Sequence, residues 1–216
     1  YILGSQSKWR NNEIRYSIRS LEKNVPNLGN VFVVGEKPRF LNIETALHIA
    51  VPDPTKNKLK NALHKIRTAC KDERIAKEFV LMNDDFFVLE PTYRFEVFDI
   101  GTLAHMRDKH KTKAGYYYRA MHDTDVYLKN HGIFNPLSYE IHYPMPIVRE
   151  DFLSATHKIA NSCSAFLFRS IYGNVCKLRS RHKCDNKMFK FSESRVKNDF
   201  VSTDNDVAID KNFQAW

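Results

Sequence analysis

Two adjacent aspartates are the residues whose type and setting most clearly indicate chemistry. Asp84 and Asp85 interrupt an apolar stretch, with four apolar residues before Asn83 and four after Asp85. Such a stretch predicts a buried strand, in which an unpaired charge is costly. Mg²⁺ and Mn²⁺ favour carboxylate oxygens, and Mg²⁺ is typically held by one or two of them together with substrate phosphates. The pair therefore predicts a metal–diphosphate site, as in an enzyme that uses a nucleotide-sugar.

Asn83, Asp84 and Asp85 are also typical of a turn, because Asn and Asp side chains often hydrogen-bond to nearby backbone. The interpretation as a metal site therefore depends on the elements that position these carboxylates.

The first ninety residues alternate between apolar runs and amphipathic segments. A helix capped by Asn11 or Asn12 would place Ile14, Ile18 and Leu21 on one face. Strands are expected at 1–4, 31–34, 47–51 and 79–89, and a second helix over 56–70. This order predicts an α/β fold with a Rossmann-like, mostly parallel sheet flanked by helices.

The rest of the chain is less regular. Residues 139–143 alternate like a strand that stops at Pro144. Helices are expected over 119–130, 150–160 and 165–172. The basic segment 105–113 predicts a mobile loop or an acceptor-binding surface, and 199–206 a polar loop.

Several segments occur in a distinctive order. Asn12-Glu-Ile-Arg-Tyr-Ser-Ile-Arg-Ser-Leu-Glu-Lys23 is followed by Val31-Phe-Val-Val-Gly35 and then by Asn83-Asp-Asp-Phe-Phe87. His142-Tyr-Pro-Met-Pro146, a predicted helix, Arg169 and Tyr172 come later. These segments resemble the second and third blocks of the Stealth family, sugar-phosphate transferases of microbial capsule synthesis related to the lysosomal-enzyme N-acetylglucosamine phosphotransferase. Small phage and bacterial proteins of unknown acceptor look closer still.

The resemblance implies a glycosyltransferase A-like fold, a UDP-sugar-like donor and Mn²⁺ or Mg²⁺ held by Asp84 and Asp85. It suggests one domain over 1–216, with a donor-binding half at 1–90 and an acceptor half at 91–216. The family carries an acidic stretch after its first strand, whereas this chain reads Ser5-Gln-Ser-Lys-Trp9. The expectation drawn from the resemblance is therefore the nucleotide-sugar fold rather than the phosphotransfer reaction itself.

Polar, basic and aromatic residues near the expected strand ends are the candidates for donor binding. They are Ser5, Ser7, Lys8, Trp9, Arg15, Arg19, Lys58, Asn61 and Lys65. Trp9 could stack on a base or fill the core, and the arginines suit bidentate phosphate contacts. The alternative for the helix residues is an ordinary solvated surface.

The candidates for catalysis are Asp85, His142 and Asp204. Asp85 would bind the metal that neutralises the leaving nucleotide. His142 could be a base for the acceptor hydroxyl, a metal ligand or a buried structural histidine. Asp204, like Asp206, could supply a base or a second ligand, or belong to a plain polar loop.

The net charge of +9 predicts an anionic partner. Basic runs at 107–113 and 177–190 and the cluster Tyr116–Tyr118 could bind DNA, and an anionic surface glycan is the other acceptor class. No apolar run is long enough to span a membrane. Cys70, Cys163, Cys176 and Cys184 are expected to be free thiols in a cytoplasmic protein, with a Cys176–Cys184 disulfide as the alternative.

The leading hypothesis is a metal-dependent glycosyltransferase whose acceptor is modified phage DNA or a glycan. The alternatives are a sugar-1-phosphate transferase that acts on a cell-surface glycan, and a non-enzymatic polyanion- or DNA-binding protein on a transferase-like fold.

Overall fold

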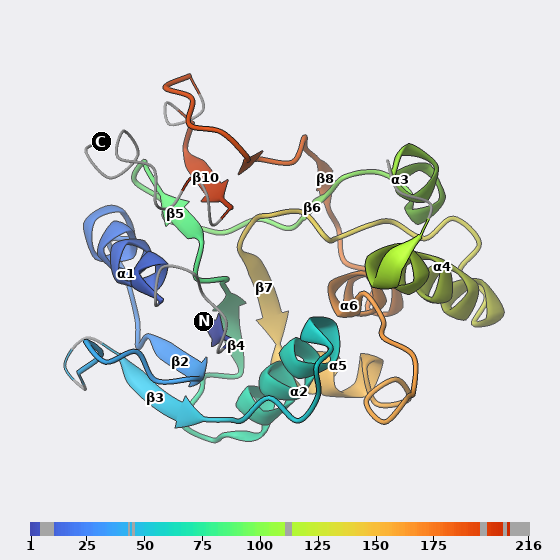
Figure 1. Ribbon diagram of the computed structural model, residues 1–216, viewed down its shortest axis with the longest axis horizontal. Helices are drawn as coiled ribbons and strands as arrows, with labels where there is room; N and C mark the ends of the chain where they lie inside the picture. Colours follow the sequence, from blue (N-terminus) through green and yellow to red (C-terminus); the bar gives the residue numbers. More distant parts are fainter. Residues whose placement is uncertain are drawn as a thin grey trace.

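The computed structural model describes residues 1–4, 11–42, 44, 46–110, 114–194, 198–204 and 207. It shows a mixed α/β protein (Figure 1). In chain order its elements are β1 (Ile2–Leu3), α1 (Asn12–Asn24), β2 (Phe32–Gly35), β3 (Leu47–Ala50), α2 (Lys58–Lys71), β4 (Glu78–Leu81), β5 (Phe86–Val88), β6 (Phe98–Asp99), α3 (Leu103–Lys109), α4 (Gly115–Asn130), β7 (Met145–Val148), α5 (Arg149–Ala155), α6 (Phe168–Val175), β8 (Arg181–His182), β9 (Lys187–Met188) and β10 (Phe200–Thr203).

A parallel sheet of β1, β2 and β3 forms the centre of the N-terminal part, with β2 in the middle. A parallel bridge between Ile2 and Asn83 joins β1 to the residues just after β4. β4 in turn pairs with β7, which runs antiparallel to it. The strands therefore follow one another in the order β3-β2-β1-β4-β7, and parallel pairing ends at β7.

The two faces of this sheet are covered by different helices, as the alternation of side chains along β2 shows. Val33 packs into the apolar cluster that contains Ile14 and Ile18 of α1, whereas Val34 packs with Ala69 of α2. Asn57 caps α2, because its side chain accepts hydrogen bonds from the backbone N–H groups of the first helical turn. The expected helices at the start of the chain are thus confirmed.

Gly35 is needed where β1, β2 and α2 meet. It has a positive φ of 124°, and a Cβ at this position would lie 2.1 Å from the Leu3 carbonyl oxygen. A side chain there would also meet Lys65 of α2. Glycine therefore permits the close approach of the β1 and β2 ends.

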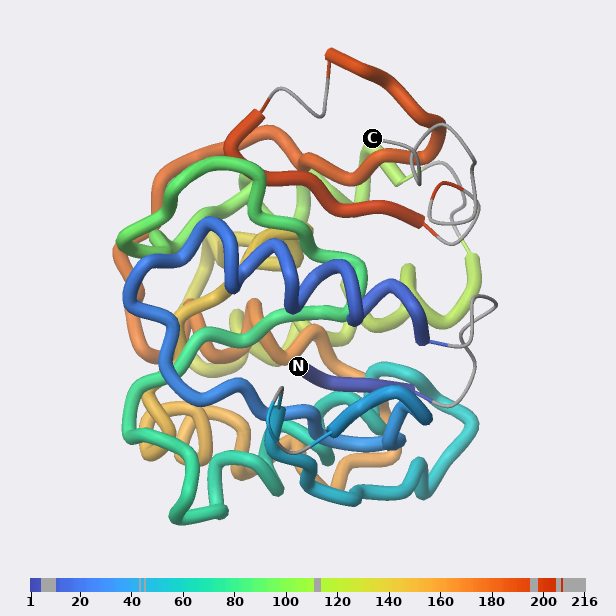
Figure 2. Tube along the Cα trace, turned by 90° about the vertical axis from the view of Figure 1, so that its left-hand side faces the viewer, coloured from blue at the N-terminus to red at the C-terminus, as the bar shows by residue number. Residues whose placement is uncertain are grey.

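The predicted single strand over 79–89 is wrong. β4 ends at Leu81, Asp84 and Asp85 form a turn, and β5 begins at Phe86. β5 pairs with β10 in a second sheet with the order β5-β10-β9, and it packs against α1 (Figure 2). The turn alternative is therefore correct for the backbone, and it places both carboxylates between the buried end of β4 and the buried strand β5.

The predicted strand over 139–143 is also wrong, and the following strand β7 includes Pro146. Side chains, rather than a neighbouring strand, satisfy the backbone before β7. Ser170 Oγ accepts from the Tyr139 N–H at 3.1 Å, and Arg169 donates to the carbonyls of Ile141 and Tyr143. Pro146 is tolerated because β7 pairs only with β4 in this sheet.

Two further segments differ from the sequence-based expectation. The predicted polar loop at 199–206 contains the buried strand β10, and part of the basic segment 105–113 belongs to α3, which Thr102 caps. These elements use polar residue types, so their pattern is not that of a strand or an amphipathic helix.

One large apolar cluster joins the two halves of the chain. It brings Leu63 and Ile66 of α2 together with Leu128 of α4 and Tyr172 of α6. All four cysteines are free thiols, as expected. Within the described ranges, no helix has the length and apolar character that crossing a bilayer requires.

Candidate active site

Two carboxylates lie side by side in the turn between β4 and β5, and a third is near enough to interact with them electrostatically. Asp84 and Asp85 are half-buried there, and the buried Glu13 of α1 faces them closely enough to act on Asp84. Burial, the adjacent Asp85 carboxylate and Glu13, in decreasing order, raise the pKa of Asp84 to about 7. The positive charge of Lys187 lowers the pKa of Asp84. The turn is therefore a place where negative charge accumulates and where a cation would be stabilised.

Asp85 is held by the strands of the second sheet. Its Oδ2 accepts a hydrogen bond from Ser202 Oγ of β10 at 3.0 Å and lies 3.4 Å from Lys187 Nζ of β9. Its backbone carbonyl accepts from the Thr203 N–H at 3.2 Å. These contacts fix the direction of one carboxylate.

Arg169 joins the segment before β7 to the aspartate turn. This buried guanidinium of α6 donates to the carbonyl oxygens of Ile141 at 3.0 Å and Tyr143 at 2.9 Å. It also donates to Asn83 Oδ1 at 3.4 Å and lies over the Phe86 ring at 5.7 Å. Segments that are about sixty residues apart in the sequence are therefore held together at one side of the turn.

His142 lies in the segment that Arg169 holds, and Asp185 orients it. Asp185 accepts from the His142 backbone N–H at 2.9 Å and from its Nδ1 at 2.8 Å. Burial alone would raise the pKa of Asp185, but the hydrogen bonds from His142 outweigh it and lower that pKa. The His142 side chain is 31% exposed, so the imidazole is positioned and still reachable from solvent.

Two more titratable side chains, those of Glu140 and Tyr117, lie near Arg169. Glu140 Oε1 accepts hydrogen bonds from the Ser170 N–H at 3.0 Å and Oγ at 3.2 Å. Burial raises the pKa of Glu140, and Arg169 opposes that shift. Burial also raises the pKa of Tyr117 on α4, and the carboxylates of Glu140 and Asp185 add to it. These groups surround Arg169. Burial lowers the pKa of Arg169, and the carboxylates of Glu140 and Asp85 raise it.

The acidic turn fits a divalent cation in one specific way. No set of three or more His, Cys, Asp or Glu side chains within the described ranges is arranged to hold a metal by itself. Asp84 and Asp85 would instead supply two carboxylates, with the remaining ligands coming from a diphosphate and water, which is a typical arrangement for Mg²⁺. The raised pKa of Asp84 supports this fit, since a cation would offset both the burial and the carboxylate repulsion that raise it.

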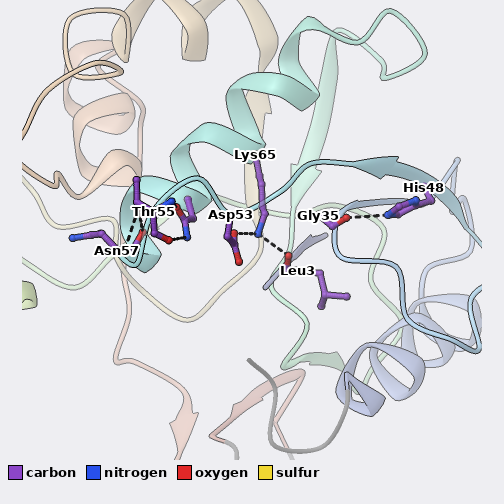
Figure 3. A network of polar contacts seen from close by, with 8 residues as sticks. Leu3, Gly35, His48, Asp53, Thr55, Asn57 and Lys65 are labelled. Atoms are coloured by element: carbon purple, nitrogen blue, oxygen red, sulfur yellow. Dashed lines mark hydrogen bonds and ion pairs between the residues drawn. The ribbon is translucent and has the colours of Figure 1, made fainter. Parts of the chain in front are cut away.

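Lys65 and Asn61 are buried, so neither belongs to an exposed helix surface. Figure 3 shows Lys65 beside Asp53 and Leu3. Lys65 is buried, forms an ion pair with Asp53 and donates to the Leu3 carbonyl at 2.8 Å. Asn61 bonds to the backbone and side chain of Thr55. Both residues therefore shape the loop between β3 and α2 at the same sheet edge as the aspartates.

The other predicted binding residues are more scattered. Lys58 is exposed at the start of α2, and Arg15 and Arg19 are exposed on α1, where they lie over the rings of Phe40 and Tyr16. None of the contacts described for these three residues reaches the aspartate turn. Ser5, Ser7, Lys8 and Trp9 lie outside the described residues.

Asp204 lies one residue after Thr203, which bonds to the Asp85 backbone. Its carboxylate accepts a hydrogen bond from the Val207 N–H at 3.0 Å. Asp206 lies outside the described residues.

Glu13, Lys187, Asp185 and Glu140 are the site residues that the sequence did not reveal. Each is an ordinary charged residue far from the aspartate pair in the sequence. The sequence signal for Glu13 was its place at the start of the helix that is predicted to follow the first strand.

Part of the positive charge of the two basic runs is paired within the protein. In the run 177–190, Arg181 pairs with Glu96, Lys183 donates to the Tyr143 hydroxyl, and Lys187 pairs with Asp85. In the run 107–113, Arg107 pairs with Asp125, while 111–113 lie outside the described residues. Several of the charges that are consecutive in the sequence therefore contact different partners on separate elements.

Comparison of the chain with known proteins found no matching family model and no matching curated protein. The interpretation of the site therefore depends on its geometry and on the segments named above.

Proposed function

We propose that this protein is a metal-dependent glycosyltransferase that moves a sugar from a nucleotide-sugar donor to an acceptor hydroxyl. The observation that carries the proposal is the pair Asp84–Asp85 at the end of β4, with Glu13 beside it and the wall of Arg169 and His142 next to it.

The fold supports this proposal through the strand order β3-β2-β1-β4-β7, in which parallel strands precede an antiparallel one. The aspartates follow β4 at the carboxyl edge of the parallel strands, where ligands of open α/β sheets usually bind. A glycosyltransferase A-like sheet has this kind of arrangement, in keeping with the resemblance drawn from the sequence.

A bound Mn²⁺ or Mg²⁺ would stabilise the charge that develops on the leaving nucleoside diphosphate. Asp85 and Asp84 would hold it. Lys187, whose ammonium group already lies beside Asp85, would contact a donor phosphate. Arg169 holds the segment that contains His142 against the aspartate turn, and it adds positive charge to the site.

His142 is the proposed base for the acceptor hydroxyl. Its Nδ1 is bonded to Asp185, so Nε2 is the nitrogen that would take the proton. Asp185 acts as a positioning residue, because it sets the ring orientation and stabilises the imidazolium that forms. The half-buried Glu140 and Tyr117 would line the acceptor side.

The test is release of nucleoside diphosphate from a panel of UDP-sugars and other nucleotide-sugars, with and without Mn²⁺. Asp85→Asn should abolish a metal-dependent signal, while the exposed Asp151→Asn should leave it unchanged. If no donor is consumed and none raises the melting temperature of the native protein under any metal, the proposal is wrong.

Sugar-1-phosphate transfer remains the alternative reaction, because a positioned base would activate an acceptor hydroxyl in either case. The mass of the product separates the two reactions, since phosphotransfer retains a phosphate between sugar and acceptor.

A further inference from the structure

A wide groove lies among the helices, away from the aspartate turn. Its walls come from the second half of α2, the end of α4, the segment from α5 to residue 161 and the end of α6. Figure 1 shows these helices close together on the side of the molecule that carries α2, α5 and α6. The groove encloses about 1500 Å³, more than the roughly 300–1,000 Å³ of typical small-molecule sites. This size favours a polymer over a small ligand.

The charge of this groove is of one sign. Among the described residues, its lining contains no Asp or Glu. It contains four residues with a fixed positive charge and three histidines: Arg67, Lys71, Lys158, Lys177, His64, His131 and His157. All except Arg67 are exposed, so their charged or polar ends face solvent. Such a concentration favours an anionic ligand.

Helix dipoles account for only part of this pattern. Lys71 and Lys177 lie at the ends of α2 and α6, where basic residues stabilise a helix. Lys158 and His157 follow α5 in an irregular turn, and His64 lies in the middle of α2. Lys177 also has a φ of 51° at a position after a helix where glycine is the usual residue.

Aromatic rings lie among the charges. The rings of Tyr127 and His131 are stacked with their centroids 4.2 Å apart, and His131 is exposed. Lys158 Nζ lies 3.5 Å from His131 Nε2. Cations that contact phosphates, next to flat rings that can stack on bases, are the features with which proteins hold single-stranded nucleic acid.

We propose that this groove binds single-stranded nucleic acid, with Lys71, Lys158 and Lys177 contacting phosphates and His131 offering a stacking surface. Arg67 is held in the groove wall by hydrogen bonds to the Leu153 carbonyl and to Thr156 Oγ1, so it adds positive charge without a phosphate contact of its own. The rings favour a nucleic acid over a phosphate polymer without bases. The concave shape disfavours a membrane surface, which a protein usually contacts through a flat or convex face. This proposal does not depend on the transferase activity.

The experiment is fluorescence anisotropy with a labelled oligo(dT) strand of about 16 nucleotides, titrated at salt concentrations from about 50 to 200 mM. Three phosphate contacts predict a slope of log K against log salt near −2.1, which is about an 18-fold loss over this range. Lys71→Gln/Lys158→Gln should reduce the slope to about one third of its native value. Lys23→Gln/Lys37→Gln, which removes the same charge from exposed sites elsewhere, should leave it unchanged.

His131→Ala separates base stacking from charge. It should weaken oligo(dT) binding about ten-fold without changing the salt slope, and it should not affect binding of inorganic polyphosphate. Absence of oligo(dT) binding by the native protein overturns the proposal. So does an equal loss in both double variants, or tighter binding of polyphosphate or phosphatidylglycerol vesicles than of oligo(dT). Circular dichroism confirms that each variant is folded.

Discussion

The aspartate turn and the basic groove use charge in opposite ways. In the turn, half-buried carboxylates lie next to each other, and Lys187 approaches Asp85 while Arg169 reaches the neighbouring Asn83. In the groove, exposed cations gather with no acidic residue in the described lining. Buried like charges that shift a pKa indicate a site tuned for a specific chemical step, whereas exposed charges of one sign indicate attraction without chemistry. The two regions should therefore fail independently.

The largest expected effect separates the regions directly. Asp85→Asn should lower metal-dependent transfer by about 10³-fold, as loss of a major electrostatic contribution to the transition state does. It should leave oligo(dT) affinity unchanged, because the groove lies elsewhere. Lys71→Gln/Lys158→Gln should show the reverse. If either variant reduces both metal-dependent transfer and oligo(dT) binding, the two regions do not act independently.

The second prediction concerns the positioning of His142. Asp185→Asn should lower kcat by about 10²-fold with little change in donor KM, since only orientation and stabilisation of the imidazolium are lost. The pH profile of kcat should shift as well, because Asp185 no longer carries a charge next to the ring. If the pH profile of kcat is unchanged in Asp185→Asn and the loss of activity matches a loss of folded protein, Asp185 has a purely structural role.

The third prediction compares stability. Arg169→Met should lower the free energy of unfolding by about 2–4 kcal/mol, because the carbonyls of Ile141 and Tyr143 lose a buried donor. Lys71→Met, in the groove, should change it by less than about 0.5 kcal/mol, since that side chain is exposed. Urea unfolding measures both values. Equal effects would show that the groove lysine is structural.

The smallest effect is a pH dependence of the metal-free protein. The pKa of Asp84 is about 7 in the folded state and about 3.9 when unfolded, so between these values the folded state binds more protons. The melting temperature should therefore fall as pH rises from about 4 to about 7, and Asp84→Asn should reduce that fall. A slope that Asp84→Asn does not change would contradict the proposed crowding of carboxylates. Other titrating groups are common to both proteins, so the difference between their profiles isolates Asp84.

Local sequence patterns predicted the elements of the first ninety residues well. The spacing of Ile14, Ile18 and Leu21 defines one helix face, and the apolar run that contains Val33 and Val34 is typical of a strand buried on both faces. The pattern failed at 79–89, because a turn between two separate strands leaves an apolar run on each side. It failed at 139–143, because the side chains of Arg169 and Ser170 replace a neighbouring strand there.

The sequence by itself determined the acid pair, the amphipathic helices and the surplus of positive charge, because these depend on residue type and short-range spacing. Only the tertiary structure decided which charges meet. It placed Glu13 and Lys187 beside the aspartates, joined His142 to Asp185, and used much of the run 177–190 in internal contacts. The groove lysines lie on separate elements of the chain. Electrostatic interaction depends on distance in space and on burial, and neither is encoded in the neighbourhood of a residue along the chain.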